Sequence, residues 1–215
     1  LKALEEMMAE RGFLDGSRMA TVFNMLRPKD LIWPYIVNNY MLGKKPFPFD
    51  LLYWNQDSTR MSPANHSYYL REFYQHNKLA KGELEFAGEK LDLGKVTTPV
   101  YTLAAKEDHI APAESVFISG QLFGGPVRYV LGGSGHIAGV INPPTEKVKY
   151  QYWTGGKPAG ELAEWIEGAK EHPGSWWPYW IEWLAKRSGG WTIPRIPGQQ
   201  LGTLEDAPGT YVKAR

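Results

Sequence analysis

Cysteine is absent from the 215-residue sequence, which excludes disulfide bonds, zinc sites built on thiolates and a thiol nucleophile within this chain. Long apolar runs are missing too, since no stretch approaches the roughly 20 residues that a helix needs to span a membrane. An excess of one charge is also lacking, because the formal net charge is only +1. Because the chain is nearly neutral, its charge gives no reason to expect nucleic acid or an acidic membrane surface as a partner.

The residues that are present have the composition of a globular protein, with unusually many aromatic side chains. Hydrophobic residues make up 43% of the chain and charged residues 22%, and the length suffices for one core with a small subdomain. Aromatic residues reach 13%, with 9 tryptophans. The first residue is leucine, and residues 1–10 already have the pattern of a helix in mid-course. We therefore expect a fragment or processed product whose natural N-terminal part lies elsewhere.

Residues 1–82 are predicted to form a mainly helical subdomain. Capping residues, prolines and glycines divide this part of the chain into separate helical segments. The predicted helices cover residues 1–11, about 15–26, 31–42 and 62–77. No convincing strand pattern occurs among the first 80 residues.

Residues 83–215 have the pattern of an α/β domain. Residues 84–93 are typical of a hairpin, and the apolar runs at residues 99–105 and 127–131 are typical of strands buried on both faces. A predicted helix over residues 112–122 joins these two strands, which indicates a parallel sheet. Beyond them the sequence predicts a polar loop holding Trp153, a helix near residues 162–169, a tryptophan-rich helix over residues 177–186 and an extended tail from residue 189.

Asp108 and His136 stand just past the ends of the two predicted strands. Because functional groups gather outside the carboxyl ends of parallel strands, we expect both side chains at the same edge of the sheet. A carboxylate there accepts a hydrogen bond from the imidazole, fixes its tautomer and stabilises the imidazolium. The pattern predicts an acid–base pair. A helix-capping aspartate and a hydrogen-bonded loop histidine remain the structural alternative.

The nucleophile that such a pair would serve is missing. In α/β-hydrolases the nucleophile precedes the acid, which precedes the histidine, so it should lie upstream of Asp108. Residues 132–136, GGSGH, superficially resemble the G-x-S-x-G nucleophile turn, but the fifth position is His136 rather than glycine. Ser175 lacks the pattern altogether. Neither Ser134 nor Ser175 therefore qualifies as the nucleophile.

Several longer motifs resemble those of the polyhydroxyalkanoate (PHA) synthases. Residues 127–144, VRYVLGGSGHIAGVINPP, resemble the histidine block of that family. Similar segments are RPKDLIW at 27–33, FDLLYWN at 49–55, KEDHIAP at 106–112, GSWWP at 174–178 and APGTYVK at 207–213. They span nearly the whole chain in order. The tryptophan-rich end most resembles class I enzymes, which favour short-chain substrates.

The resemblance implies the C-terminal part of an α/β-hydrolase fold. Residues 83–215 would supply the C-terminal part of its parallel sheet, and residues 1–82 a mainly helical cap that covers the pocket and contributes to a homodimer. The family polymerises (R)-3-hydroxyacyl-CoA, such as 3-hydroxybutyryl-CoA, into polyhydroxyalkanoate and releases CoA. A cysteine upstream of Leu1 would carry the acyl chain in a Cys-His-Asp triad. His136 would be the general base, and Asp108 would orient it or activate the incoming 3-hydroxyl.

Further site residues and partners follow from the same resemblance. Trp54 matches a tryptophan that the family places near the active site, Arg27 is a candidate for binding a CoA phosphate, and His109 is a candidate supporting residue beside Asp108. A core aromatic, an exposed arginine and a loop histidine are the structural alternatives. The CoA thioester is the substrate, so no cofactor or metal is expected. Expected partners are acyl-CoA, nascent polyester and phasin or other granule proteins, at polyester granules in the cytoplasm.

Two other functions stay open at this point. An esterase or thioesterase would give the acyl group to water, and a granule-binding or dimerisation fragment would have no activity. Without the cysteine, this chain alone is expected to be inactive in any case. We interpret the tryptophans within residues 176–183 as core packing rather than as a polymer-binding surface, because tryptophans at helical spacing belong to cores more often than to ligand platforms.

Overall fold

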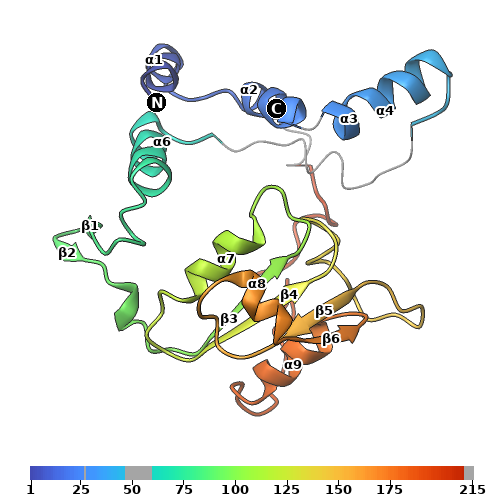
Figure 1. Ribbon diagram of the computed structural model, residues 1–215. Helices are drawn as coiled ribbons and strands as arrows, with labels where there is room; N and C mark the ends of the chain where they lie inside the picture. The colour runs from blue at the N-terminus through green and yellow to red at the C-terminus, as the bar shows by residue number, and fades with distance from the viewer. Residues whose placement is uncertain (27, 47–59, 211–215) are drawn as a thin grey trace. The chain divides into compact units, whose positions relative to one another are not determined.

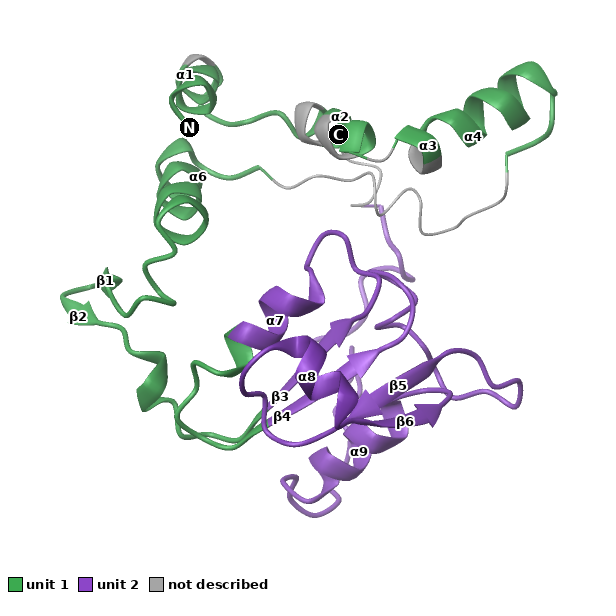
Figure 2. Cartoon of the chain, in the orientation of Figure 1, with its two compact units in different colours: residues 1–100, 119–127 green, residues 101–118, 128–215 purple. Residues whose placement is uncertain are grey.

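The computed structural model describes residues 1–26, 28–46 and 60–210 (Figure 1). They form two compact units, one of residues 1–100 with 119–127, the other of residues 101–118 with the chain from residue 128 onward (Figure 2). Helices and a sheet of both parallel and antiparallel strands make this a mixed α/β protein, which confirms the predicted class at that level. The predicted division into residues 1–82 and 83–215 stays a prediction.

Short helices make up most of the described part of the first unit. They are α1 (Lys2–Arg11), α2 (Gly16–Leu26), α3 (Pro28–Leu31), α4 (Trp33–Tyr35) with the π-helical η1 (Ile36–Met41), and α6 (Pro63–Tyr69) with the π-helical η2 (Leu70–Gln75). Gly12 ends α1 in the left-handed conformation, and the Ser62 side chain accepts the N–H of Asn65 at the start of α6, as predicted. An ion pair between Glu5 and Arg71 joins α1 to η2.

The prediction of one regular helix over residues 31–42 is wrong in its details. Helical backbone begins earlier, at Pro28, is interrupted at Ile32 and continues as α4 and η1. Pro34 lacks the N–H that would bond back to the preceding turn, so α3 and α4 cannot form one continuous α-helix.

The predicted hairpin is present but shorter than expected. It pairs β1 (Glu85–Phe86) with β2 (Glu89–Lys90), and the 3₁₀ turn η3 (Leu93–Lys95) follows. Ala87 and Gly88 form the turn with φ values of 51° and 81°, the left-handed pair that a two-residue hairpin turn requires. Glu89 therefore begins the second strand, opposite Phe86.

The main sheet has the strand order β3 (Val100–Ala105), β4 (Val127–Gly132), β5 (Gln151–Thr154) and β6 (Lys170–Pro173). β3 and β4 run parallel, since Val100 N–H donates to the Pro126 carbonyl and Lys106 N–H to the Gly132 carbonyl with the same sequence offset. β5 is antiparallel to both β4 and β6.

The predicted parallel pairing of the two apolar runs is confirmed in β3 and β4, but the sheet continues with antiparallel strands where a polar loop was predicted. Trp153, expected in that loop, lies on β5 opposite Leu131, and His172 lies on β6 opposite Tyr152. These strands have four residues each, too few for an alternating pattern to stand out in the sequence. Pairing with a long-range neighbour, rather than local pattern, makes them strands.

Helices cover both faces of this sheet (Figure 1). α7 (Ala113–Gly120) and α8 (Leu162–Glu167) pack on one face, where Phe117 and Trp165 contact the ring of Tyr129 edge to face. α9 (Trp177–Ala185) packs on the other face, where Tyr101 contacts Trp183 at 5.4 Å between ring centroids. Because helices occupy both faces, the strand ends and their loops are where polar groups can meet.

Candidate acid–base site

Hydrogen bonds tie the chain together beyond the carboxyl ends of β3 and β4. Glu107 N–H donates to the carbonyl of Ser134 at 3.0 Å, and Asp108 N–H turns back to the carbonyl of Ala105 at 3.1 Å. A backbone hydrogen bond thus still joins the two segments two residues after the strands end. This arrangement brings the segment that carries Asp108 against the segment that carries His136.

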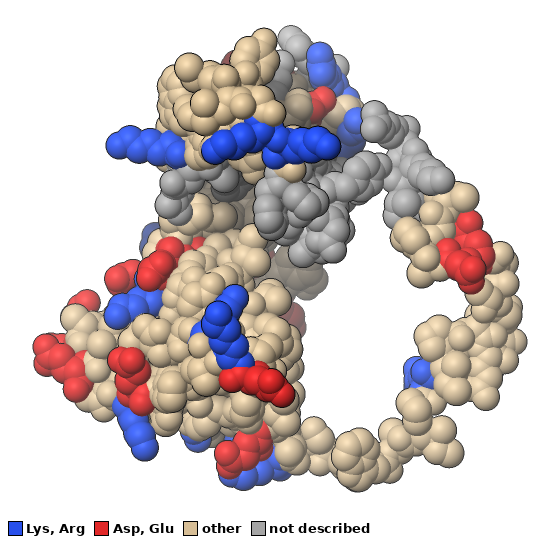
Figure 3. All heavy atoms as spheres, turned by 90° about the vertical axis from the view of Figure 1, so that its right-hand side faces the viewer, with Lys and Arg blue, Asp and Glu red and all other residues tan. Residues whose placement is uncertain are grey.

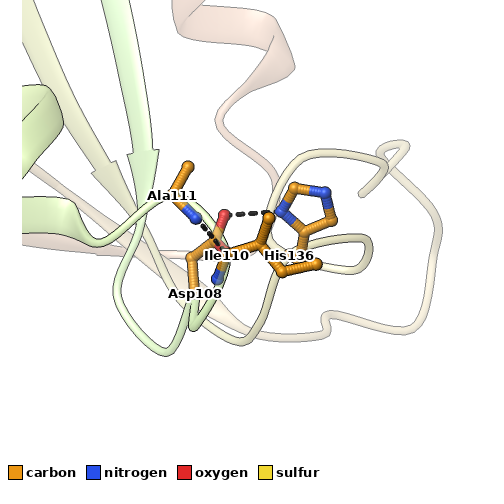
Figure 4. A network of polar contacts seen from close by, with 4 residues as sticks. All are labelled: Asp108, Ile110, Ala111 and His136. Carbon is orange, nitrogen blue, oxygen red and sulfur yellow. Dashed lines mark hydrogen bonds and ion pairs between the residues drawn. The ribbon is translucent and has the colours of Figure 1, made fainter. Parts of the chain in front are cut away.

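The two carboxylate oxygens of Asp108 have different partners. Oδ1 accepts the backbone N–H of Ile110 at 2.8 Å and that of Ala111 at 2.9 Å, while Oδ2 lies 2.8 Å from Nδ1 of His136 (Figure 4). The Asp108 side chain is only 6% exposed. One oxygen is therefore fixed by the backbone, and the other is aimed at the imidazole.

This environment keeps Asp108 ionised. Burial raises the pKa of the carboxyl, but the Ala111 N–H, the His136 ring and the Ile110 N–H together stabilise the charged form more. The net result is a pKa below the usual value for aspartate. A carboxylate with this charge favours the histidine tautomer that carries its proton on Nδ1.

His136 combines a fixed side with an open side. Nδ1 faces Asp108, Nε2 lies on the far side of the ring, and the side chain is 44% exposed (Figure 4). With the proton on Nδ1, Nε2 carries a lone pair that can accept a proton from another group. The pair therefore has the arrangement of a general base oriented by a carboxylate.

Close backbone packing shapes the loop that presents His136. Ser134 has a φ of 70°, and Gly133 N–H donates to the carbonyl of Gln151 on β5 at 2.7 Å. A Cβ on Gly139 would lie 2.5 Å from Cβ of Ala105, closer than atoms can approach. The loop therefore packs closely against Ala105 at the end of β3. Ala105 also accepts the N–H of Asp108 in the turn that follows the strand.

The structure brings together two of the five predicted site residues, Asp108 and His136. His109 follows Asp108 and is exposed. Arg27 and Trp54 lie outside the described residues. Roles in substrate binding for these three residues stay predictions.

Sequence reasoning missed the backbone donors at Ile110 and Ala111. An aspartate whose side chain accepts N–H groups two and three residues ahead forms an Asx turn, a recognisable local feature. It also missed the carbonyl of Val140, which accepts hydrogen bonds from two tryptophans of the C-terminal part. No local sequence pattern predicts the hydrogen bonds to the Val140 carbonyl, because their donors lie 36 and 37 residues away in the sequence.

The residues that the structure describes hold neither a candidate metal cluster nor a helix suited to crossing a membrane. Within them, no cluster of three or more His, Cys, Asp or Glu side chains is arranged to hold a metal ion. The helices in the same ranges are all too short or too polar to cross a membrane. On the face shown in Figure 3, Lys and Arg are interspersed with Asp and Glu over the lower part of the view. That mixture does not create a field of one sign over this part of the surface.

Comparison with known proteins identifies relatives along the whole chain. No family model matches it. The chain is 57% identical over 216 residues to the poly(3-hydroxyalkanoate) polymerase of Methylorubrum extorquens, an alignment covering 100% of this chain and 36% of that protein. It is 55% identical over 215 residues to the poly(3-hydroxyalkanoate) polymerase subunit PhaC of Rhizobium meliloti, covering 100% and 35%. The subunit of that name from Cupriavidus necator is 43% identical over 205 residues, covering 94% and 35%.

These matches confirm the resemblance that the motifs indicated. The chain spans about a third of the length of the curated relatives it matches. Along its whole length, this chain is a homologue of the poly(3-hydroxyalkanoate) polymerases.

Proposed function

We propose that this chain is the acid–base part of a polyhydroxyalkanoate synthase, an acyltransferase that converts (R)-3-hydroxyacyl-CoA into polyester and CoA. The observation that carries the proposal is the 2.8 Å contact between His136 Nδ1 and Asp108 Oδ2 beyond two adjacent parallel strands. The contact occurs in a chain that is homologous throughout to proteins named poly(3-hydroxyalkanoate) polymerases.

In the proposed reaction, His136 moves protons for a cysteine supplied from outside this chain. Nε2 takes the thiol proton, the thiolate attacks the thioester carbonyl, and the carbon–sulfur bond to CoA breaks as the imidazolium returns the proton to the CoA sulfur. The 3-hydroxyl of another acyl unit then attacks the acyl-enzyme and loses its proton to His136. An ester bond forms, and the cysteine recovers its proton. Asp108 orients the ring throughout and offsets its positive charge.

Polymer growth requires the acyl-enzyme to react with a hydroxyl rather than with water, so the site must exclude water. Exposed apolar side chains close to the pair in the sequence suit that requirement, since Ile110 is 47% exposed and Ile137 is 62% exposed. We propose that an acyl chain replaces water on these side chains. We propose short-chain substrates such as 3-hydroxybutyryl-CoA on the likeness of the tryptophan-rich end to class I enzymes.

The proposal extends to the architecture and the surroundings of the enzyme. The parallel β3–α7–β4 unit with an acid and a histidine after its strands supports an α/β-hydrolase fold. Residues 1–82 would form the helical cap and a homodimer contact, in keeping with exposed apolar side chains such as Trp33, Tyr40 and Met41. We place the enzyme at polyester granules in the cytoplasm, with phasins as candidate partners and His109, Arg27 and Trp54 as candidate substrate contacts.

The test is CoA release from 3-hydroxybutyryl-CoA by the complete protein that the gene encodes, with the product examined for insoluble polyester. CoA release with polymer is the expected result. CoA release with only free 3-hydroxy acid would replace the proposal with an esterase or thioesterase. No release, together with binding of the protein to polyester particles, would indicate a granule-binding protein instead.

A further inference from the structure

Two tryptophans at the start of α9 donate to the same backbone oxygen. The indole N–H of Trp176 lies 3.2 Å from the carbonyl oxygen of Val140, and that of Trp177 lies 3.0 Å from it. A carbonyl oxygen has two lone pairs, so both hydrogen bonds can form together. Val140 belongs to the loop that carries His136 and lies four residues after it.

A hydrogen-bonded turn connects Val140 to the histidine. Gly139 N–H donates to the carbonyl of Gly135 at 2.8 Å, and Ile141 N–H donates to that of Ile137 at 2.8 Å. The first bond closes a turn that contains His136, the second closes a turn that contains Val140, and the two turns overlap at residues 137–139. The contact of Gly139 with Ala105 prevents these turns from moving toward β3. A displacement of Val140 would therefore displace His136 relative to Asp108.

The donors themselves are held by the sheet. Trp176 is only 8% exposed and stacks on Tyr101 of β3 with ring centroids 6.2 Å apart. Trp177 meets Trp176 edge to face at 6.4 Å. β3 leads directly into the turn that carries Asp108. The strand that leads to the aspartate thus also supports the tryptophans that hold the histidine loop.

We infer that Trp176 and Trp177 are positioning residues for His136, acting through the Val140 carbonyl to keep its ring at hydrogen-bond distance from Asp108. The inference rests on the proposed function for its kinetic consequence. It gives Trp176, which is buried, a task besides core packing, and it gives the half-buried Trp177 a task that core packing does not cover. Neither ring needs to contact substrate.

The experiment replaces each indole by a ring of similar shape that lacks the N–H donor. Trp176→Phe, Trp177→Phe and the double variant are made in the complete protein, and Trp180→Phe serves as the matched control. Trp180 packs against Trp176 with centroids 5.8 Å apart, on the same helix, and is not a donor to Val140. The measurements are kcat and KM for CoA release from 3-hydroxybutyryl-CoA, and amide hydrogen exchange across residues 133–142 and across β3 and β4.

We expect the double variant to lose about tenfold in kcat with KM within about twofold of wild type, because a small misplacement of a catalytic group slows the chemical step. Amides of Gly139 and Ile141 should exchange faster, while β3 and β4 exchange as in wild type. Trp180→Phe should change neither kcat nor exchange.

Each contrary result overturns the inference in a different way. An active wild-type enzyme with an unchanged double variant removes the positioning role and leaves the proposed function standing. A raised KM with unchanged kcat assigns the tryptophans to substrate binding, and faster exchange throughout the sheet assigns them to general stability. If the wild-type protein releases no CoA, the proposed function fails, and unchanged exchange at Gly139 and Ile141 then overturns the positioning role as well.

Discussion

At the scale of single residues, Asp108 is a charged group held by three donors on two sides. Its backbone partners fix the carboxylate whether or not the histidine is present, because Ile110 and Ala111 bind the oxygen that His136 does not. The imidazole therefore meets an acceptor that is already in place. Such preorganisation lowers the cost of orienting the ring during reaction.

Replacing His136 by alanine should lower CoA release by the complete protein at least about 10³-fold, because the proposed cysteine loses its general base. The side chain is 44% exposed, so circular dichroism and the thermal unfolding midpoint should stay close to wild type. The control is His76→Ala, an exposed histidine at the end of η2, which should leave CoA release unchanged. Turnover close to wild type in His136→Ala would refute the acid–base role.

Asp108→Asn isolates the charge of the carboxylate, since asparagine still offers Oδ1 to Ile110 and Ala111. Turnover should fall between about 10² and 10⁴-fold, because an amide no longer offsets the positive charge of the imidazolium. If Asp108 instead activates the incoming hydroxyl, the first CoA release in a single-turnover experiment should stay fast while later turnovers slow. Rapid-quench measurement of CoA separates the two roles.

The same substitution predicts a pH dependence of stability. The pKa of Asp108 lies below its usual value of about 3.9 in the folded protein, so ionisation adds stability that is complete above the unfolded pKa. That contribution is lost as the pH falls through the folded pKa. Wild type should therefore be more resistant to urea than Asp108→Asn at pH 7, and the difference should disappear in strong acid. An equal difference at both pH values would contradict the pKa assignment.

At the scale of elements, the loop after β4 is held by close contacts that only glycine permits. A Cβ at Gly139 would lie 2.5 Å from Ala105, 2.7 Å from the Gly135 carbonyl and 2.8 Å from the Gly133 carbonyl. The last two atoms are backbone and cannot rotate away. The loop must shift as a whole if a side chain is introduced there.

Gly139→Ala should thus cost about 1–3 kcal/mol of stability and reduce CoA release, because the shift moves His136 away from Asp108. Gly156→Ala is the matched control, since a Cβ there would meet nothing within 4 Å. Differential scanning fluorimetry and the CoA assay on both variants give the comparison. Equal behaviour of the two variants would show that the contact of Gly139 with β3 does not constrain the site.

At the scale of the whole molecule, burial in the sheet-bearing unit concentrates on the face covered by α7 and α8. The buried cluster joins residues from strands and helices far apart in the sequence: Ala104, Ala113, Phe117, Tyr129, Leu131, Trp153, Leu162 and Trp165. The ring centroids of Trp165 and Tyr129 are 4.9 Å apart, and the indole N–H of Trp165 donates to the carbonyl of Gly156 at 3.0 Å. It links α8 to β4 and to the turn after β5.

Trp165→Ala should destabilise this unit by about 3–5 kcal/mol, because it removes a large buried side chain and leaves a cavity. The thermal unfolding midpoint should fall by about 10 °C or more. Trp191→Ala removes the same side chain from a position with 106% relative exposure and should leave the midpoint unchanged. A similar loss in both variants would argue against the core assigned to Trp165.

Much of the fold could be predicted because its signals are local. Gly12 ends α1, Ser62 begins α6, and the apolar runs around Leu103 and Val130 mark β3 and β4, since caps and buried strands depend on neighbouring residues. The strands β5 and β6 were missed, because segments of four residues are too short for a decisive pattern and the side chains of β6 are mostly exposed. The π-helical geometry of η1 and η2 was missed because a helical pattern in the sequence does not distinguish α-helical from π-helical hydrogen bonding.

The sequence by itself determined the likeness to the poly(3-hydroxyalkanoate) polymerases, the mixed α/β class and the choice of Asp108 and His136 as the candidate pair, because strand ends and linear motifs are read directly from residue order. Only the tertiary structure decided that the two side chains lie 2.8 Å apart and that Ile110 and Ala111 hold the carboxylate. Tertiary structure likewise decided that Trp176 and Trp177 meet the carbonyl of Val140. Contacts between residues distant in the chain arise from packing of the sheet and its helices, and no local pattern encodes them.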